Sequence, residues 1–278
     1  MIVIHHNDLD GICAAAIVNR KFKDSNEIKF ISTTYSKRIN LSIVLENETV
    51  FILDYSFQHL DDWENLLKRT SDIIWIDHHI SSINNEKYPH HLKGVRENNK
   101  SGALLTWEYL FPNEKIPLSV EYINDFDLWI FEYKEQTDYF NKGLFLVDHS
   151  PDSTIWNKLL DKNYHTSIAN MIDNGKIIVK YQNKINNSII KHQTKQIIWE
   201  NYKCLVVNNR GTSQMFDSID KSEVDLLIWW HFTNNMFVVT IATIKTGIDV
   251  SLICQKYNGG GHKQIGGFQL NVLPKEFI

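Results

Sequence analysis

Short apolar runs alternate with helical patterns in the first half of the chain. The runs cover residues 1–4, 28–31, 50–53 and 73–76. Each is rich in β-branched or aromatic residues, which is typical of buried strands. Between them, residues 11–22 and 57–68 have the apolar spacing of helices. This alternation predicts βαβ units and a parallel sheet, and so an α/β fold.

The pattern continues with a candidate fifth strand and another helix. Residues 94–97 have the composition of a short strand, and residues 101–110 have the spacing of a helix. Ser101 directly precedes that helix and is a plausible N-cap.

The second half of the chain reads differently. Residues 167–199 indicate one long or broken helix, with Gly175 as the candidate break. Strand patterns return at 204–207, 226–230 and 237–241, and a helical pattern at 249–257 precedes the glycine-rich segment GGGHKQIGGF. We therefore expect an N-terminal parallel-sheet domain over 1–150, a helical connector over 151–200 and a smaller C-terminal α/β domain over 201–278.

Composition supports a globular protein. Of the 278 residues, 43% are hydrophobic and 22% are charged. No apolar run approaches the roughly 18 residues of a membrane-spanning helix, so we expect no membrane partner. The opening MIVIHHNDLD lacks the basic region of a secretory signal. The cysteines are three, far apart and outside any CxxC, which disfavours disulfides and a cysteine zinc site and suits the cytoplasm.

Charge is unevenly distributed between the halves. Residues 1–150 carry a balance of −8 and residues 151–278 a balance of +4, for a net charge of −4. The acidic half is either a solvated surface or a set of carboxylates that awaits cations. The overall balance argues against a protein that coats long nucleic acid, because such proteins usually carry a basic stripe.

Carboxylates and imidazoles follow three of the predicted strands. They are His5, His6, Asp8 and Asp10 after the first, Asp54 after the third, and Asp77, His78 and His79 after the fourth. Taken singly, Asp54 is explained as a helix cap, and Asp8 and Asp10 as turn residues. Together at one rim they would repel each other unless cations bind, and this donor set suits Mn²⁺ or Mg²⁺, with Zn²⁺ a further candidate.

The spacing of Asp8 and Asp10 suggests how two ions could be held. In an extended segment, residues two apart point the same way. Their carboxylates would then serve two neighbouring metals. A two-metal site can activate water and clamp phosphoryl oxygens, which points to phosphoester or phosphoanhydride hydrolysis.

Five motifs in order now become specific: HHNDLDG at 5–11, Asp54 within FILDYS, DHH at 77–79, FDLW at 126–129 and GGGHKQIGGF at 259–268. The chain resembles the DHH phosphoesterase superfamily, including its associated C-terminal substrate domain. The motifs span nearly the whole sequence, and they look closest to the nanoRNase (oligoribonuclease) branch and its RecJ-like relatives.

The resemblance implies roles for individual residues. The implied ligands of two metal ions are His6, Asp8, Asp10, Asp54, His78 and Asp127. Asp54 would bridge the ions, Asp77 would support the site and His79 would face the substrate phosphate, which makes Asp54, Asp77 and His79 the expected catalytic residues. Asp125 competes with Asp127, and His5 with His6. The expected substrate-binding residues are Gly259, Gly260, Gly261 and His262.

The implied activity is hydrolysis of short single-stranded RNA or DNA to mononucleotides, with two Mn²⁺ ions (Mg²⁺ as the alternative) activating water. The alternatives are a RecJ-like exonuclease on single-stranded DNA, a 3′,5′-bisphosphate nucleotidase, a cyclic-dinucleotide phosphodiesterase and a pyrophosphatase, which GGGH disfavours. A catalytically inactive binding protein is the alternative from another class. Sugar type, polarity and oligomeric state stay open.

Some positions depart from the pattern. Ala242 stands where relatives usually carry an arginine, and Lys245 is a candidate to replace that charge. Arg210 could also reach substrate. The Ser101–Gly102 backbone at the start of a predicted helix could bind phosphate or form an ordinary cap.

Overall fold

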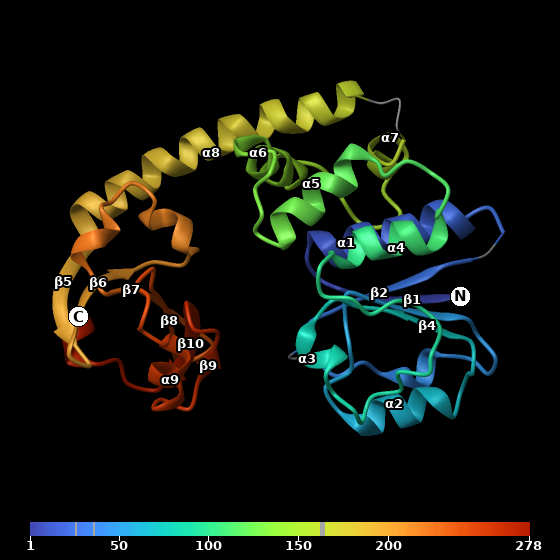
Figure 1. Ribbon diagram of the computed structural model, residues 1–278, viewed down its shortest axis with the longest axis horizontal. Coiled ribbons are helices and arrows are strands. Elements are labelled where there is room, and N and C mark those ends of the chain that lie inside the picture. The colour runs from blue at the N-terminus through green and yellow to red at the C-terminus, as the bar shows by residue number, and fades with distance from the viewer. Residues whose placement is uncertain (26, 36, 162–164) are drawn as a thin grey trace. The chain divides into compact units, whose positions relative to one another are not determined.

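The computed structural model describes residues 1–25, 27–35, 37–161 and 165–278. The chain divides into two compact units, Met1–Val179 and Lys180–Ile278 (Figure 1). The division falls inside one long helix, α8 (His165–Gln193). The three-part division at residues 150 and 200 stays a proposal.

The first unit is built around a four-stranded parallel sheet. Its strands are β1 (Ile2–His6), β2 (Lys29–Thr33), β3 (Val50–Leu53) and β4 (Ile73–Ile76). They lie in the order β2-β1-β3-β4, with every pair parallel. The four predicted strands and the α/β class are confirmed, and all carboxyl ends meet at one edge of the sheet.

Helices cover both faces of this sheet. Figure 1 shows α1 (Leu9–Phe22) and α4 (Gly102–Leu110) on one face and α2 (Leu60–Leu67) on the other. Alternate strand residues join opposite cores: Val3 packs with α1, whereas Ile4 packs in the cluster that contains Trp63 of α2. A sheet buried on both faces explains why its strands read as continuous apolar runs.

The expected strand at 94–97 is wrong. Only isolated bridges, Ile74 to Lys93 and Asp77 to Arg96, join this segment to the sheet. Gly94 has φ 114°, and an added Cβ would lie 2.0 Å from the carbonyl oxygen of Trp75. The left-handed backbone at this close contact interrupts regular strand pairing.

The remaining helices of the first unit lead to α8. They are α3 (Ile80–Ile83), α5 (Leu118–Asp127), α6 (Glu135–Leu144) and α7 (Ile155–Leu159). The expected break at Gly175 is wrong, because α8 continues through it. An added Cβ at Gly175 would lie 1.6 Å from the carbonyl oxygen of Tyr139, so this glycine permits close helix contact.

The second unit is a six-stranded mixed sheet in the order β5-β6-β7-β8-β10-β9. The strands are β5 (Thr194–Trp199), β6 (Tyr202–Asn208), β7 (Leu226–Thr233), β8 (Met236–Ala242), β9 (Gly260–Gly261) and β10 (Ile265–Leu270). Residues 194–199, expected as helix, form the edge strand β5 instead. Helix α9 (Val250–Gln255) packs on one face of the sheet, and Ile189 and Ile190 of α8 pack on the other.

Short 3₁₀ turns complete the structure: Leu41–Ile43, Ser213–Phe216, Lys221–Glu223 and Lys275–Phe277. Among the described residues, no helix combines the length and apolar character needed to cross a bilayer.

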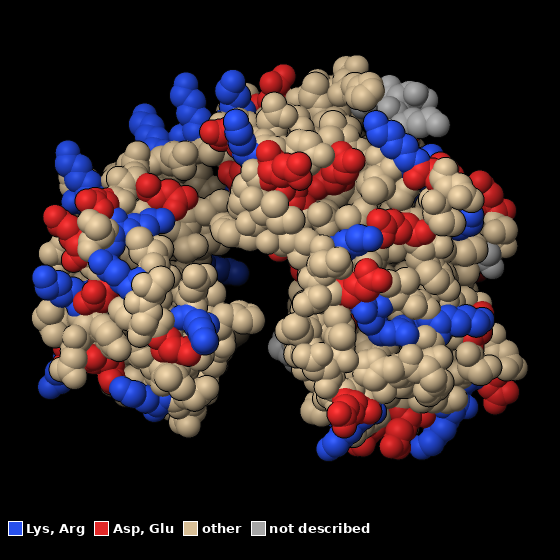
Figure 2. Space-filling model, viewed as in Figure 1, with Lys and Arg blue, Asp and Glu red and all other residues tan. Residues whose placement is uncertain are grey.

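Surface charge differs along the chain. Figure 2 shows acidic and basic side chains interspersed over the first unit, whereas blue side chains project along α8. The exposed lysines of this helix include Lys176, Lys180, Lys184 and Lys191.

Candidate metal centre

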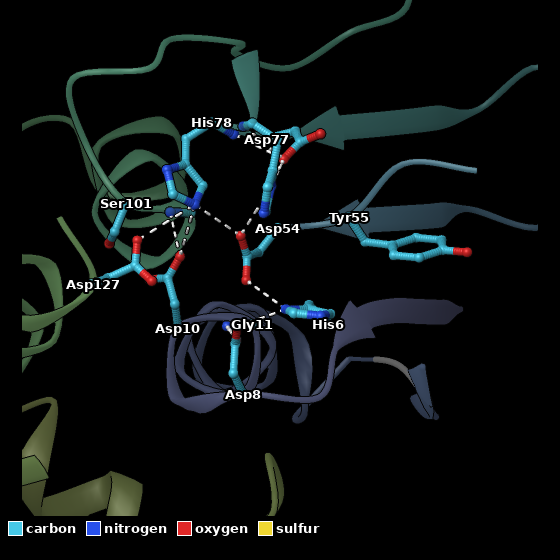
Figure 3. Close-up of polar contacts among 12 residues, drawn as sticks. His6, Asp8, Asp10, Gly11, Asp54, Tyr55, Asp77, His78, Ser101 and Asp127 are labelled. Carbon is cyan, nitrogen blue, oxygen red and sulfur yellow. Dashed lines mark hydrogen bonds and ion pairs between the residues drawn. The ribbon is translucent and has the colours of Figure 1, made fainter. Parts of the chain in front are cut away.

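The candidate site forms where three parallel strands end. Strand β1 leads into His6, Asp8 and the start of α1, while Asp54 directly follows β3. Asp77 and the two following histidines come directly after β4. Figure 3 shows these side chains turned toward one another, with Asp127 joining from the end of α5. The sheet edge therefore gathers the residues expected from the sequence.

The first group of candidate ligands is His6, Asp8 and Asp54. The Nδ1 atom of His6 lies 2.6 Å from Oδ2 of Asp8 and 3.6 Å from Oδ2 of Asp54. The other oxygen of Asp8 caps α1 by accepting the Gly11 N–H at 2.9 Å. Because helix capping fixes the Asp8 carboxylate, the group is preorganised.

The second group is Asp10, His78 and Asp127. The Nε2 atom of His78 lies 3.9 Å from Oδ2 of Asp10 and 3.4 Å from Oδ2 of Asp127. Asp10 belongs to α1 and Asp8 is its cap, so the expectation that both point the same way from an extended segment is wrong. The helix start turns them apart, which places one carboxylate in each group.

Asp54 lies between these groups and also forms a third with His78 and His79. Its Oδ1 atom is 3.1 Å from Nε2 of His78 and 3.7 Å from Nδ1 of His79. The side chain is 1% exposed, and neither carboxylate oxygen accepts a hydrogen bond from the described residues. Its φ of 53° lies in the left-handed region, which turns the chain sharply after β3.

The electrostatics of the cluster follow from burial and repulsion. Burial and the neighbouring Asp10 raise the pKa of Asp54 well above its ordinary value, and the same two causes raise the pKa of Asp127 to about 8. Burial likewise raises the pKa of Asp10. The carboxylates of Asp54 and Asp8 raise the pKa of His6 to about 10. Without a cation, the cluster is therefore driven to retain protons.

These observations test whether a metal ion fits. The cluster offers carboxylate oxygens and imidazole nitrogens, and the buried oxygens of Asp54 and one of Asp127 lack hydrogen-bond donors among the described residues. Buried anionic oxygens without donors are costly unless a cation binds. Oxygen and nitrogen donors suit Mn²⁺ or Mg²⁺. The residues present fit divalent cations.

Asp77 lies outside the three groups and organises the loop beside them. Its buried Oδ1 accepts the backbone N–H groups of His78 and His79 at 2.9 and 3.2 Å, and it lies 2.8 Å from Nδ1 of His79. These contacts fix the direction of the His79 ring, which is 30% exposed. Such a contact is what a residue that orients the site would make.

The two competing residues point elsewhere. The His5 ring is buried, and its Nδ1 lies 2.8 Å from the carbonyl oxygen of His6, while burial lowers its pKa. Asp125 is buried too, and its carboxylate accepts backbone N–H groups of Glu132 and Tyr133. The three groups contain His6 and Asp127 rather than these neighbours.

The Ser101–Gly102 backbone is already occupied. The carboxylate of Asp10 accepts the N–H groups of Gly102 and Ala103 at 2.6 and 2.9 Å, and the Ser101 hydroxyl caps the helix by accepting the Leu104 N–H at 3.4 Å. The cap is confirmed, whereas a phosphate there would have to displace Asp10. The start of α4 thus positions a candidate metal ligand, a role that sequence spacing did not reveal.

Tyr35 is a further neighbour of the site that sequence reasoning missed. Its ring centroid lies 5.2 Å from that of His6 and 5.5 Å from that of His79, and the ring stacks on Tyr55 at 5.3 Å. Burial and nearby carboxylates raise the pKa of its hydroxyl, so it stays protonated. No motif or spacing marks this residue.

The glycine-rich segment lies in the second unit. An added Cβ would lie 2.2 Å from the Gly267 carbonyl oxygen at Gly259 and 2.3 Å from the Gly266 Cα at Gly261. These two glycines permit close pairing of β9 with β10, whereas Gly260 faces open space. His262 is exposed, and its N–H closes the hairpin on the Ile265 carbonyl oxygen at 2.7 Å.

A cavity of about 610 Å³ adjoins this segment. Gly259, Lys256 and Asn271 belong to its lining, and the stacked rings of Tyr257 and Phe268 form part of its wall. Elsewhere in this unit, Ala242 is buried, and Lys245 donates to the Ser222 carbonyl oxygen. That bond holds the Lys245 ammonium group, which was the candidate replacement for an arginine.

Comparison with known proteins agrees with the N-terminal architecture. The model of the DHH family, N-terminal domain, matches residues 1–124. "Uncharacterized protein R106" of Acanthamoeba polyphaga mimivirus is 25% identical over 292 residues, covering 96% of this chain and 66% of its own length. The chain thus spans just under two thirds of that relative.

Solved structures share the fold. The pGpG-specific phosphodiesterase PggH of Vibrio cholerae has a TM-score of 0.58 at 13% identity, with 97% of this chain and 92% of that chain covered. The DHH domain of a protein described as a member of a ribosomal protein family gives 0.63 at 13%, covering 96% and 81%. RecJ with Mn²⁺ from Thermus thermophilus gives 0.52 at 13%, covering 97% and 49%. At these identities the likeness concerns the fold alone.

Proposed function

Residues 1–124 match the N-terminal domain of the DHH family, and from this premise we propose that the chain is a metal-dependent phosphoesterase that hydrolyses short single-stranded oligonucleotides to mononucleotides. The observation that carries the proposal is Asp54. Its carboxylate is buried, accepts no hydrogen bond from the described residues and belongs to two groups that could each hold a cation. A carboxylate placed in this way is suited to bridge two ions.

The proposed ligands are His6, Asp8, Asp10, Asp54, His78 and Asp127, with two Mn²⁺ or Mg²⁺ ions as the cofactor. When bound, divalent ions supply Lewis acidity that activates water and offsets charge on phosphoryl oxygens. The amides of Gly102 and Ala103 hold the Asp10 carboxylate, and the Gly11 amide holds that of Asp8. The ligand set is therefore positioned before a substrate arrives.

His79 would contact the phosphate. Its Nδ1 is engaged by Asp77, so the proton that this ring can give or take during the reaction is the one at Nε2. Asp77 acts by orienting that ring. In the second unit, the backbone at Gly260 and the exposed His262 would bind substrate, because Gly260 alone of the three adjacent glycines leaves room for a ligand.

The substrate class is proposed from charge. The net charge is −4, and the face of the first unit in Figure 2 mixes both signs. A long polyanion is bound mainly through phosphate contacts with a basic surface. A short oligonucleotide needs fewer of these contacts, so it suits this surface better.

The test is hydrolysis of a ladder of single-stranded RNA and DNA, from dinucleotides to long oligomers, with Mn²⁺. We expect rapid conversion of the shortest rungs to mononucleotides. Asp54→Asn keeps the side-chain shape but removes the bridging charge, so turnover should fall by at least about a hundredfold to a thousandfold. Asp61→Asn on the exposed side of α2 is the matched control.

The same assay identifies the alternatives. Efficient shortening of long DNA would indicate a RecJ-like exonuclease. Intact ladders would direct the assay to 3′,5′-bisphosphate nucleotides and cyclic dinucleotides. Retention of metal-dependent turnover in Asp54→Asn would refute this site.

A further inference from the structure

The loop after α5 holds an exposed tryptophan in an unusual backbone. Trp129, Phe131 and Lys134 have φ values of 58°, 55° and 55°. Bulky side chains rarely adopt this left-handed region, and such residues persist only where the surroundings fix them. The loop is thus held in a defined shape despite an unfavourable local conformation.

Asp125 provides that constraint. Its carboxylate, 2% exposed, accepts the backbone N–H groups of Glu132 at 2.8 Å and Tyr133 at 3.2 Å, as well as the Thr137 hydroxyl. Its carbonyl oxygen accepts the Ile130 N–H at 3.0 Å. A buried charge-assisted network of this kind fixes the loop strongly.

The Trp129 ring is fixed but not covered. Its centroid lies 5.6 Å from that of Phe126 and 4.9 Å from that of Phe131, at interplanar angles of 64° and 86°. These edge contacts orient the indole, yet the residue is 56% exposed. A rigid, solvent-exposed indole face is suited to stacking against another planar ring.

The position of this ring suggests its partner. Trp129 follows Asp127 by two residues, so their Cα atoms lie within about 8 Å of each other. The Oδ2 atom of Asp127 lies 3.4 Å from Nε2 of His78 in a candidate metal group. A base that is joined through its sugar to a phosphate at this group could reach the indole.

We propose that Trp129 is a stacking site for a nucleobase of the substrate, next to the phosphate that is cleaved. The proposal rests on the proposed function in taking a nucleotide as ligand. Stacking tolerates any base, because every base has a π-face. Trp129 therefore favours nucleotides over phosphates without a base, and it does not select a sequence.

The test is calorimetric binding of AMP and of ribose 5-phosphate in Mn²⁺. Trp129→Leu should weaken AMP binding by roughly 5- to 150-fold and leave ribose 5-phosphate binding unchanged. Trp129→Phe should retain most of the AMP affinity. Ile130→Ala is the matched control, because Ile130 is also 56% exposed but has no aromatic face.

Equal weakening of both ligands by Trp129→Leu, no change in AMP binding, or no binding of AMP to the unaltered protein would each overturn the stacking site. Melting curves check that the variants fold. The readout is independent of turnover. A protein that cleaves no oligonucleotide but binds AMP through Trp129 would refute the proposed function alone, and one that cleaves oligonucleotides without using Trp129 would refute the stacking site alone.

Discussion

The two units handle polar groups in opposite ways. In the first, buried Asp54 at the carboxyl edge of a parallel sheet has no hydrogen-bond donor among the described residues. In the second, the charged groups beside the cavity are paired: Lys256 lies 2.6 Å from Glu200, which also accepts the Tyr257 hydroxyl at 2.7 Å. The first unit therefore needs a cation to satisfy its buried charges, whereas these groups of the second are satisfied internally.

Glycines show the same contrast between the units. Gly175 lies where two helices of the first unit touch backbone to backbone, and Gly260 faces open space on a short edge strand. Identical residues thus have different reasons to be glycine, namely packing in one case and access in the other.

The largest expected effect comes from Gly175→Ala. A Cβ 1.6 Å from the Tyr139 carbonyl oxygen forces α6 and α8 apart, so we expect a loss of about 3 kcal/mol or more in the free energy of unfolding. Alanine's higher helix propensity offsets about 1 kcal/mol at most. Chemical denaturation measures the change. Asn183→Ala, exposed on the same helix, should be neutral or slightly stabilising; equal behaviour of both variants would contradict the packing argument.

Cation binding should give the next largest effect, and only in the first unit. Mn²⁺ at about one hundred times its Kd stabilises by about 2.7 kcal/mol. The cluster pKa values are raised, so in chelator the stability present at low pH is lost as pH rises through about 8 for Asp127 and about 10 for His6. The rise in Tm with Mn²⁺ should therefore be larger at about pH 8 than at about pH 5.5.

Melting curves in chelator and in Mn²⁺ across this range measure the difference. Asp54→Asn should lose most of the Mn²⁺-dependent rise in Tm. A rise that is the same at both pH values, or unchanged in the variant, would show that the cations stabilise the protein elsewhere.

The smallest effect on stability is expected at Gly260. Its added Cβ meets no atom within 4 Å, so Gly260→Ala should change the free energy of unfolding by less than about 0.5 kcal/mol. The KM should rise if a ligand approaches this backbone. Gly261→Ala is the contrast: φ is 142° and its Cβ would lie 2.3 Å from Gly266 Cα, so it should destabilise. Melting and steady-state kinetics compare the two; similar melting of both would contradict the assignment.

The strands of the first sheet could be predicted because each is a short apolar run between polar segments. The residues at 50–53 and 73–76 form strands over the predicted ranges. Parallel strands deliver their following residues to one edge, so the meeting of Asp54 and His78 also followed from the sequence. The errors at 94–97, Gly175 and 194–199 arose where local pattern was overridden by contacts with distant parts of the chain.

By itself, then, the sequence determined the parallel sheet, the edge at which the chemistry lies and the ordered DHH motifs, because these depend on local periodicity and strand direction. Only the tertiary structure decided how the groups divide. The start of α1 separates Asp8 from Asp10, the end of α5 brings Asp127 to His78, and the amides of α4 hold Asp10. It also exposed Trp129, since that ring's position depends on the buried carboxylate of Asp125 rather than on its own neighbours in sequence.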